Sequence, residues 1–274
     1  MKLSVVMPTR NKRALLERTL NALLAQDAGT DAWEVVVVND GSTDDTGAAL
    51  ARLASSQPRL RVVTPPRNVG RAAARNLGWR EASGRWILFL DDDILTPPGL
   101  LRAHLDLLAS VPDAGTIGPA VTAPEIVDAP HFHYIDTRGV AKLPPGPAPG
   151  KYFVTQNAGV PRAALAEVGG FDEGYAAYGF EDMDIGFSLE DAGVRFQVLP
   201  APVHLRPVFP AAPGRAPSAA SAGDAPGPRD RRPREHAAGP DPPSAARRAA
   251  RLARAPGVAA RGHLAGRGQR ASAA

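Results

Sequence analysis

The stretch Trp86-Ile87-Leu88-Phe89-Leu90-Asp91-Asp92-Asp93 decides the fold, because an apolar run leads directly into three aspartates. A short continuous apolar run is typical of a strand buried on both faces, as the strands of a parallel sheet are. Ligands of such sheets bind beyond the carboxyl ends of the strands. The stretch therefore predicts a parallel sheet with an acidic site at its rim.

The same pattern recurs through the first half of the chain, where apolar runs alternate with patterns of helical period. Strands are predicted at 3–8, 33–38 and 60–63, and helices at 13–26, 44–54, 71–82 and after Pro97-Pro98. Such alternation indicates right-handed βαβ units. The predicted fold class is α/β, with a mostly parallel, Rossmann-type sheet.

The second half has a different pattern. It predicts strands at 114–121 and 195–199, helices at 162–168 and 181–192, and a proline-rich irregular stretch at 124–150. Gly193 suits the C-terminal cap of the last of these helices.

Charge divides the chain near Leu205. The net charge of +4 suggests by itself an anionic partner. However, residues 1–204 hold 19 Lys and Arg against 24 Asp and Glu, whereas residues 205–274 hold 13 Arg against four acids. The second segment is mostly Ala, Arg, Pro and Gly and has too little apolar surface to offset its ordering entropy. We therefore predict one folded domain over 1–204, a tail over 205–274 that is disordered or results from a shifted reading frame, and no nucleic-acid substrate.

Composition also limits the chemistry. The chain has no cysteine, which excludes a cysteine nucleophile, disulfides and thiolate metal sites. No run approaches the roughly 18 apolar residues of a membrane-spanning helix, and the N-terminal apolar run is too short for a signal peptide. We expect a cytoplasmic protein whose basic tail is a candidate for peripheral contact with the inner face of the membrane.

Two polar clusters follow predicted strands, and a third lies at the start of the helix predicted at 71–82. Asp91 and Asp93 can point the same way and would suit Mg²⁺ or Mn²⁺ together with substrate phosphates, or they form a solvated turn. Asp40 can accept hydrogen bonds from a nucleobase or ribose, or it belongs to an ordinary turn and helix cap. Arg71 and Arg75 lie four residues apart on one helix face, where they meet a diphosphate or solvent.

A fourth cluster opens the helix predicted at 181–192. Glu181 and Asp182 can include a general base, or they are the acids that any helix start favours. His204 follows a proline-flanked strand end and is a metal ligand or plain surface.

Taken in order, five motifs resemble the family-two glycosyltransferases, which have the nucleotide-sugar-binding GT-A fold. They are SVVMPTRN (4–11), VVVVNDGSTDDT (35–46), NVGRAAARN (68–76), ILFLDDDI (87–94) and GFEDMDIGFSLEDAG (179–193). The last resembles the Gly-x-Glu-Asp element of galactosyltransferase-like members. The resemblance spans residues 2–204 and implies a nucleotide-binding half over 1–110 and an acceptor half over 111–204.

The resemblance implies roles for individual residues. The donor is a nucleoside diphosphate-sugar, for which we expect UDP as the nucleotide. Its nucleobase and ribose are lined by Pro8, Thr9 and Asp40. Arg71 matches a position near its phosphates. Asp91 lies nearer the ribose or sugar and Asp93 on the Mn²⁺ or Mg²⁺ ion, with His204 loosely aligned to a third metal ligand. Asp182 matches the general base and Glu181 a contact to the acceptor or donor sugar.

The expected function is metal-dependent, inverting transfer of one sugar to a hydroxyl of a glycan, lipid-linked or small-molecule acceptor, as in the synthesis of cell envelope polysaccharide. The chain lacks the Gln-x-x-Arg-Trp element of processive synthases, which favours single addition. One alternative is a nucleotidyltransferase, but Pro8–Asn11 lacks the glycine-rich loop that it would need. The other is a binding protein that has lost activity, against which the complete set of acids argues.

Overall fold

The computed structural model describes residues 3–28, 33–121, 139–175, 179–200 and 204–205. Within them lies an eight-stranded sheet in the order β3-β2-β1-β4-β8-β5-β9-β7. Its strands are β1 (Leu3–Thr9), β2 (Trp33–Asn39), β3 (Leu60–Val63), β4 (Trp86–Leu90), β5 (Ala114–Ile117), β7 (Gly146–Pro147), β8 (Asn157–Pro161) and β9 (Arg195–Val198). A small second sheet pairs β6 (Ala120–Val121) with β10 (His204–Leu205).

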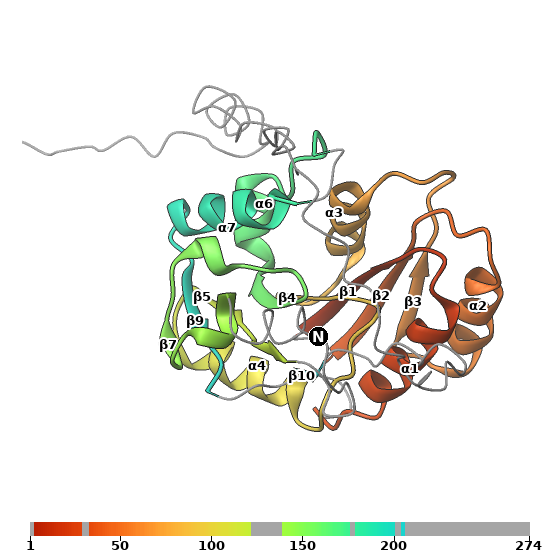
Figure 1. The fold of residues 1–274 in the computed structure, drawn as a ribbon, viewed down its shortest axis with the longest axis horizontal. Helices are drawn as coiled ribbons and strands as arrows, with labels where there is room; N and C mark the ends of the chain where they lie inside the picture. The colour runs from red at the N-terminus through yellow and green to blue at the C-terminus, as the bar shows by residue number, and fades with distance from the viewer. Residues whose placement is uncertain (1–2, 29–32, 122–138, 176–178, 201–203, 206–274) are drawn as a thin grey trace, which may run out of the picture.

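Helices cover both faces of the large sheet (Figure 1). They are α1 (Arg13–Leu24), α2 (Thr46–Ser56), α3 (Arg71–Glu81), α4 (Leu100–Ser110), α6 (Arg162–Val168) and α7 (Glu181–Asp191), with short 3₁₀ turns η1 (Gly139–Lys142) and η2 (Gly150–Tyr152). The predicted α/β class is confirmed.

Alternate residues of the central strands belong to two separate hydrophobic cores, one on each face of the sheet. On one face Met7 and Leu88 pack with residues of α1 and α4 such as Leu20. On the other face Val6 and Phe89 pack with residues of α3, α6 and α7. Each fully buried aliphatic or aromatic side chain contributes about 1.5–3 kcal/mol. The two-sided burial explains why these strands are apolar at nearly every position.

The structure of the second half differs from the predictions in two places. The stretch predicted as one strand at 114–121 divides into β5 and β6, which belong to different sheets. The strand β8 was not predicted, and it runs antiparallel to both β4 and β5. The sheet is therefore mixed but mostly parallel. Residues 206–274 of the predicted tail and 124–138 of the irregular stretch lie outside the described residues.

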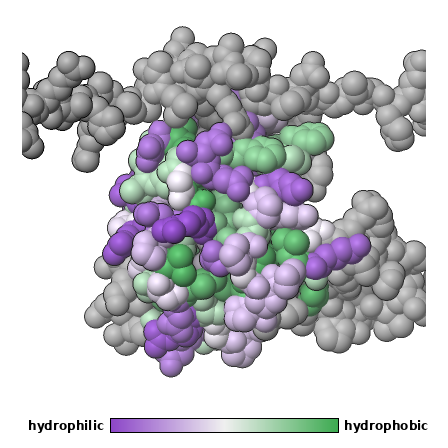
Figure 2. All heavy atoms as spheres, turned by 90° about the vertical axis from the view of Figure 1, so that its left-hand side faces the viewer, coloured by the Kyte–Doolittle hydropathy of each residue, from purple (hydrophilic) through white to green (hydrophobic). Residues whose placement is uncertain are grey.

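The surface on the α7 side of the molecule, which Figure 2 shows, has hydrophilic and hydrophobic residues intermixed. Among the described helices, none is both long enough and apolar enough to span a bilayer.

A buried histidine makes the stability of this fold depend on pH. His104 of α4 is fully buried, with Nδ1 2.7 Å from Thr116 Oγ1 and Nε2 2.8 Å from Asn157 Oδ1. Burial lowers the pKa of His104 to about 4, although the hydrogen bond to Asn157 opposes the shift. Because the folded pKa lies below the unfolded one, this stabilisation is complete above about pH 6.5 and is lost as the pH falls.

We expect this residue alone to lower the free energy of unfolding by about 2.5 kcal/mol between pH 7 and pH 4.5. Urea unfolding of the wild type and of His104→Gln at both pH values measures it. Between pH 7 and pH 4.5, the free energy of unfolding should fall by about 2.5 kcal/mol less in the variant than in the wild type, since glutamine does not titrate. Equal losses in the two proteins would assign the pH dependence to other groups.

Candidate active site

Acidic side chains from distant parts of the sequence meet at the rim where β1, β2 and β4 end. These strands are mutually parallel, so their carboxyl ends lie at the same edge. Asp91, Asp92 and Asp93 follow β4, and Glu181 and Asp182 begin α7. The antiparallel strand β8 brings its amino end to this edge, because Asn157 pairs with Leu90.

Arg75 of α3 joins the two acidic segments. Its side chain is only 7% exposed. Nη1 lies 3.1 Å from Glu181 Oε1 and 3.5 Å from Asp182 Oδ1, and Nη2 lies 3.9 Å from Asp91 Oδ1. One guanidinium therefore faces three carboxylates, and the cluster retains an excess of negative charge.

The two acids of α7 are held in fixed orientations. The backbone N–H of Thr155 donates to Asp182 Oδ2 at 3.1 Å, and the Thr155 hydroxyl donates to Asp182 Oδ1 at 3.0 Å. The backbone N–H of Gly179 donates to Glu181 Oε2 at 3.1 Å. Burial raises the pKa of Asp182, while Arg75 and the bonds from Thr155 oppose the shift. A raised pKa makes a carboxylate a better proton acceptor.

Asp91 is the most perturbed acid of the site. Its side chain keeps 34% of its surface exposed, yet desolvation by the surrounding protein raises its pKa to about 6. The charge of Arg75 opposes this shift, whereas the charges of Asp93 and Asp182 add to it. A second cation beside Asp91 would relieve this repulsion.

Asp92 and Asp93 have different environments. Thr9 Oγ1 donates to Asp92 Oδ2 at 2.7 Å, and Lys12 Nζ lies 2.9 Å from Asp92 Oδ1 and 3.0 Å from Asp93 Oδ2. Burial lowers the pKa of Lys12, but the two aspartates outweigh it and hold the pKa above its usual value. Asp92 is buried in these contacts, whereas Asp93 remains partly exposed.

The donor set fits a hard divalent cation. The described residues include no group of three His, Cys, Asp or Glu side chains arranged as metal ligands. Asp91 and Asp93 supply carboxylate oxygens, a set that suits Mg²⁺ or Mn²⁺ when phosphate oxygens and water complete the shell. The backbone of His204 lies in β10 beside Ala120, but its side chain is outside what the structure describes, so its role as a third ligand stays a prediction.

Asp40 holds the loop that leads into α3. Its buried carboxylate accepts hydrogen bonds from the N–H groups of Val69 at 2.7 Å and Gly70 at 3.1 Å. A nucleoside would share this carboxylate with the loop, so Asp40 as a nucleoside ligand stays a prediction. Pro8 lies in β1 opposite Val38.

The two arginines predicted to share a helix face have different environments. Arg71 is the first residue of α3 and is exposed, whereas Arg75 is buried among the acids. Residue types alone also did not indicate Lys12 and Thr155. In the sequence, Lys12 is marked only by its place four residues after Pro8. Thr155 is marked only as a hydroxyl residue two positions before β8, a strand that the sequence did not predict.

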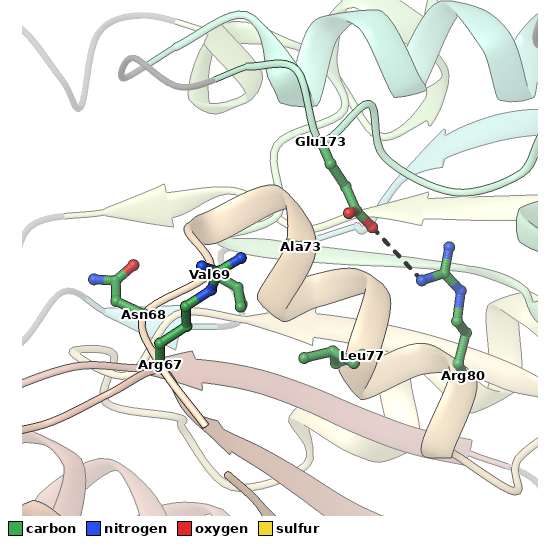
Figure 3. A pocket seen from close by; sticks show the side chains of 7 residues that line it. All are labelled: Arg67, Asn68, Val69, Ala73, Leu77, Arg80 and Glu173. Atoms are coloured by element: carbon green, nitrogen blue, oxygen red, sulfur yellow. Dashed lines mark ion pairs between the residues drawn. The ribbon is translucent and has the colours of Figure 1, made fainter. Parts of the chain in front are cut away.

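A cavity of about 460 Å³ lies along the outer side of α3 (Figure 3). It is lined by Arg67, Asn68, Val69, Ala73, Leu77, Arg80 and Glu173. Across it, Glu173 Oε1 lies 3.6 Å from Arg80 Nη1. None of the acids of the rim lines the cavity, so it is separate from the cluster around Arg75.

The chain is similar to known glycosyltransferases. The model of glycosyl transferase family 2 matches residues 4–165. A validoxylamine A glucosyltransferase of Streptomyces hygroscopicus subsp. jinggangensis is 32% identical over 232 residues, which cover 72% of this chain and 53% of that protein. The putative teichuronic acid biosynthesis glycosyltransferase TuaG of Bacillus subtilis is 37% identical over 105 residues, 38% of this chain and 41% of that protein. The chain spans about half the length of these curated relatives.

Solved structures of similar fold include a mannosyltransferase and the protein TarS. The mannosyltransferase PcManGT of Pyrobaculum calidifontis, in complex with GDP-Man and Mn²⁺, has a TM-score of 0.61 and 27% identity, covering 76% of this chain and 57% of that one. TarS 1–349 of S. aureus with UDP-GlcNAc has a TM-score of 0.63 and 21% identity, covering 77% of this chain and 60% of that one. These likenesses confirm the predicted GT-A-like fold.

Proposed function

This chain belongs to glycosyltransferase family 2, and from that premise we propose that it transfers a single sugar from a nucleoside diphosphate-sugar to an acceptor hydroxyl with inversion. The observation that carries the proposal is the cluster of Asp91, Glu181 and Asp182 around the buried Arg75. In this proposal residues 1–110 bind the donor and residues 111–204 the acceptor. The family match favours glycosyl transfer over the nucleotidyltransferase alternative.

Asp182 is the proposed general base. Thr155 holds its two carboxylate oxygens by donating to both, so the carboxylate has a fixed direction. It accepts the proton of the acceptor hydroxyl as that oxygen bonds to the anomeric carbon and the bond to the diphosphate breaks. One displacement of this kind inverts the anomeric carbon. Glu181, also held by Arg75, contacts a sugar hydroxyl.

Asp91 and Asp93 are the proposed metal ligands. A divalent cation bound by them would stabilise the negative charge that develops on the departing diphosphate. Lys12 already pairs with Asp92 and Asp93, so a divalent cation at Asp93 would share that carboxylate with the Lys12 ammonium. Arg71, exposed at the start of α3, lies at a helix N-terminus that favours the donor phosphates.

On the donor side, Pro8, Thr9 and Asp40 are the proposed contacts of the nucleobase and ribose. A uridine diphosphate-sugar is our first candidate, and a guanosine diphosphate-sugar is the second because the solved relative PcManGT is in complex with GDP-Man and Mn²⁺. A thermal-shift screen of nucleoside diphosphates and their sugars, with and without Mn²⁺ or Mg²⁺, separates them. The true donor should raise the unfolding temperature most, and by more with a divalent cation than without one.

The names of the relatives suggest the chemical class of the acceptor. One relative is named for glucosylation of validoxylamine A, and others for teichuronic acid and succinoglycan synthesis. We propose that a ring-bearing hydroxyl compound is the acceptor, and that transfer to it by the full chain, detected as a new glycoside with inverted anomeric configuration by NMR, tests the function. A product with retained configuration would contradict the mechanism.

Replacing Asp93 with alanine should remove the metal-dependent part of nucleotide binding. Thermal shifts with UDP alone should be alike in the wild type and Asp93→Ala, whereas the further rise on adding Mn²⁺ should be lost in the variant. Asp106→Ala is the matched control, since Asp106 is an exposed acid in the interior of α4 whose ion pair is with Arg102 of the same helix. An undiminished Mn²⁺ effect in Asp93→Ala would remove Asp93 from the metal site.

A further inference from the structure

One residue beside the proposed base has a backbone conformation that its side chain disfavours. Among the described residues, three that are not glycine have positive φ: Asn11 at 53°, Asp113 at 56° and Phe180 at 69°. Asparagine and aspartate adopt this region several times more often than other residues, whereas a bulky residue there is an outlier. The left-handed conformation of Phe180 is therefore strained.

Packing does not compensate for this strain. The Phe180 side chain is 55% exposed, the largest exposed fraction among the large hydrophobic residues that the structure describes. A phenyl ring left mostly in water contributes little hydrophobic stabilisation. Backbone strain kept without a stability benefit is typical of binding and catalytic sites.

The position of Phe180 is fixed relative to Asp182. The carbonyl oxygen of Phe180 accepts the hydrogen bond from the Asp184 N–H at 2.9 Å, so the residue caps the helix that carries Asp182. The Gly179 N–H on its other side is bound to Glu181. A second exposed apolar residue, Val154, directly precedes Thr155, which holds Asp182. One exposed apolar residue thus directly precedes Thr155, and the other lies two residues before Asp182.

From this arrangement we infer that Phe180 is a specificity-determining residue on which the acceptor ring lies. Sugars and cyclitols present an apolar face of C–H groups, and an aromatic ring offers a flat apolar surface of matching size. A ring lying on Phe180 would present its equatorial hydroxyls sideways, and the proposed base Asp182 lies only two residues further along the chain. This inference rests on the proposed function and adds to it that the acceptor is a six-membered polyhydroxylated ring rather than an extended chain.

The test compares Phe180→Gly, Phe180→Tyr and the control Phe187→Ala in the full chain. Glycine relieves the strained φ, so the unfolding temperature of Phe180→Gly should not fall below that of the wild type. Phe187 is also an exposed phenylalanine of α7, at 36%, but it lies in the helix interior with ordinary φ. It therefore controls for loss of an exposed aromatic ring.

The probes are UDP-glucose with methyl β-D-glucopyranoside, methyl α-D-mannopyranoside or myo-inositol, and the measured quantity is sugar transfer. For whichever ring gives the wild type the fastest transfer, Phe180→Gly should raise the acceptor KM about tenfold, more than it changes the donor KM. Phe180→Tyr should restore the acceptor KM to within about twofold, and Phe187→Ala should leave it unchanged.

Three results would overturn the inference. The first is an unchanged acceptor KM in Phe180→Gly. The second is a fall of several degrees in its unfolding temperature, which would give the ring a structural role. The third is a wild type that releases UDP from UDP-glucose but transfers to none of the three rings. Release of UDP by the wild type also shows that the proposed donor chemistry stands, so failure of the inference is distinguishable from failure of the function.

Discussion

Substituting Arg75 by methionine should lower the free energy of unfolding by about 3–5 kcal/mol, the range for removing one partner of a buried ion pair. The guanidinium is almost fully buried and faces the carboxylates of Asp91, Glu181 and Asp182. Without it, three negative charges remain close together in a region already poorly solvated. Methionine keeps much of the apolar volume of the side chain, so the loss reports the charge rather than a cavity.

The pH dependence of this loss identifies its cause. Burial already raises the pKa values of Asp91 and Asp182, and removal of Arg75 would raise them further. Protonation then relieves the repulsion, so the destabilisation should be smaller at pH 5 than at pH 7.5. Urea unfolding at the two pH values measures it.

Arg80→Met is the matched control for this experiment. Arg80 lies on the same helix but is half exposed, and its ion pair with Glu173 spans 3.6 Å at the surface. Such pairs contribute about 0–1 kcal/mol. Equal destabilisation by the two substitutions would mean that Arg75 acts as an ordinary surface arginine.

The second large effect is expected from Asp182→Asn, which should lower kcat for transfer at least about a hundredfold. Asparagine has nearly the same shape and can still accept one hydrogen bond from Thr155, but its amide cannot take a proton from the acceptor. Binding of the nucleotide should be largely retained, because the proposed role of Asp182 is to act on the acceptor. Transfer rates and thermal shifts with UDP and Mn²⁺ measure the two properties separately.

Asp191→Asn supplies the comparison for this substitution. Asp191 is an exposed acid at the last position of α7, and Asp182 lies in the first turn of the same helix. The control should transfer at the wild-type rate. Wild-type turnover by Asp182→Asn as well would remove Asp182 from the mechanism.

Most of the sheet could be predicted because its strands are apolar at consecutive positions. The strand β8 could not, because Asn157-Ala158-Gly159-Val160-Pro161 contains four residue types that are depleted in strands. The structure gives the reason for Gly159: a Cβ there would lie 2.5 Å from Thr116 Oγ1 on β5. The glycine at this position of β8 is therefore required by a contact with β5, which the local sequence pattern does not reveal.

The site was predictable to a similar degree. The carboxylates stand out because they follow apolar strands or open a helix, and the roles that the family resemblance implies for them stay predictions. Arg75 and Thr155 act through partners distant in sequence: Arg75 bonds to Glu181 across 106 residues, and Thr155 to Asp182 across 27. No spacing rule connects such positions, so the charge balance and the orientation of Asp182 emerge only from the fold.

The placement of β8 also sets the order in which the strands and the residues of the site come together while the chain is synthesised. Chains leave the ribosome from the N-terminus, and β1 to β4 can pair with one another before residue 100 is made. β8 then has to insert at the open edge of β4, and β5 and β9 join the sheet only through it. The acids that follow β4 are thus assembled early, whereas Asp182 arrives last. A translation product that stops before α7 is expected to contain the proposed donor half without Asp182, the proposed base.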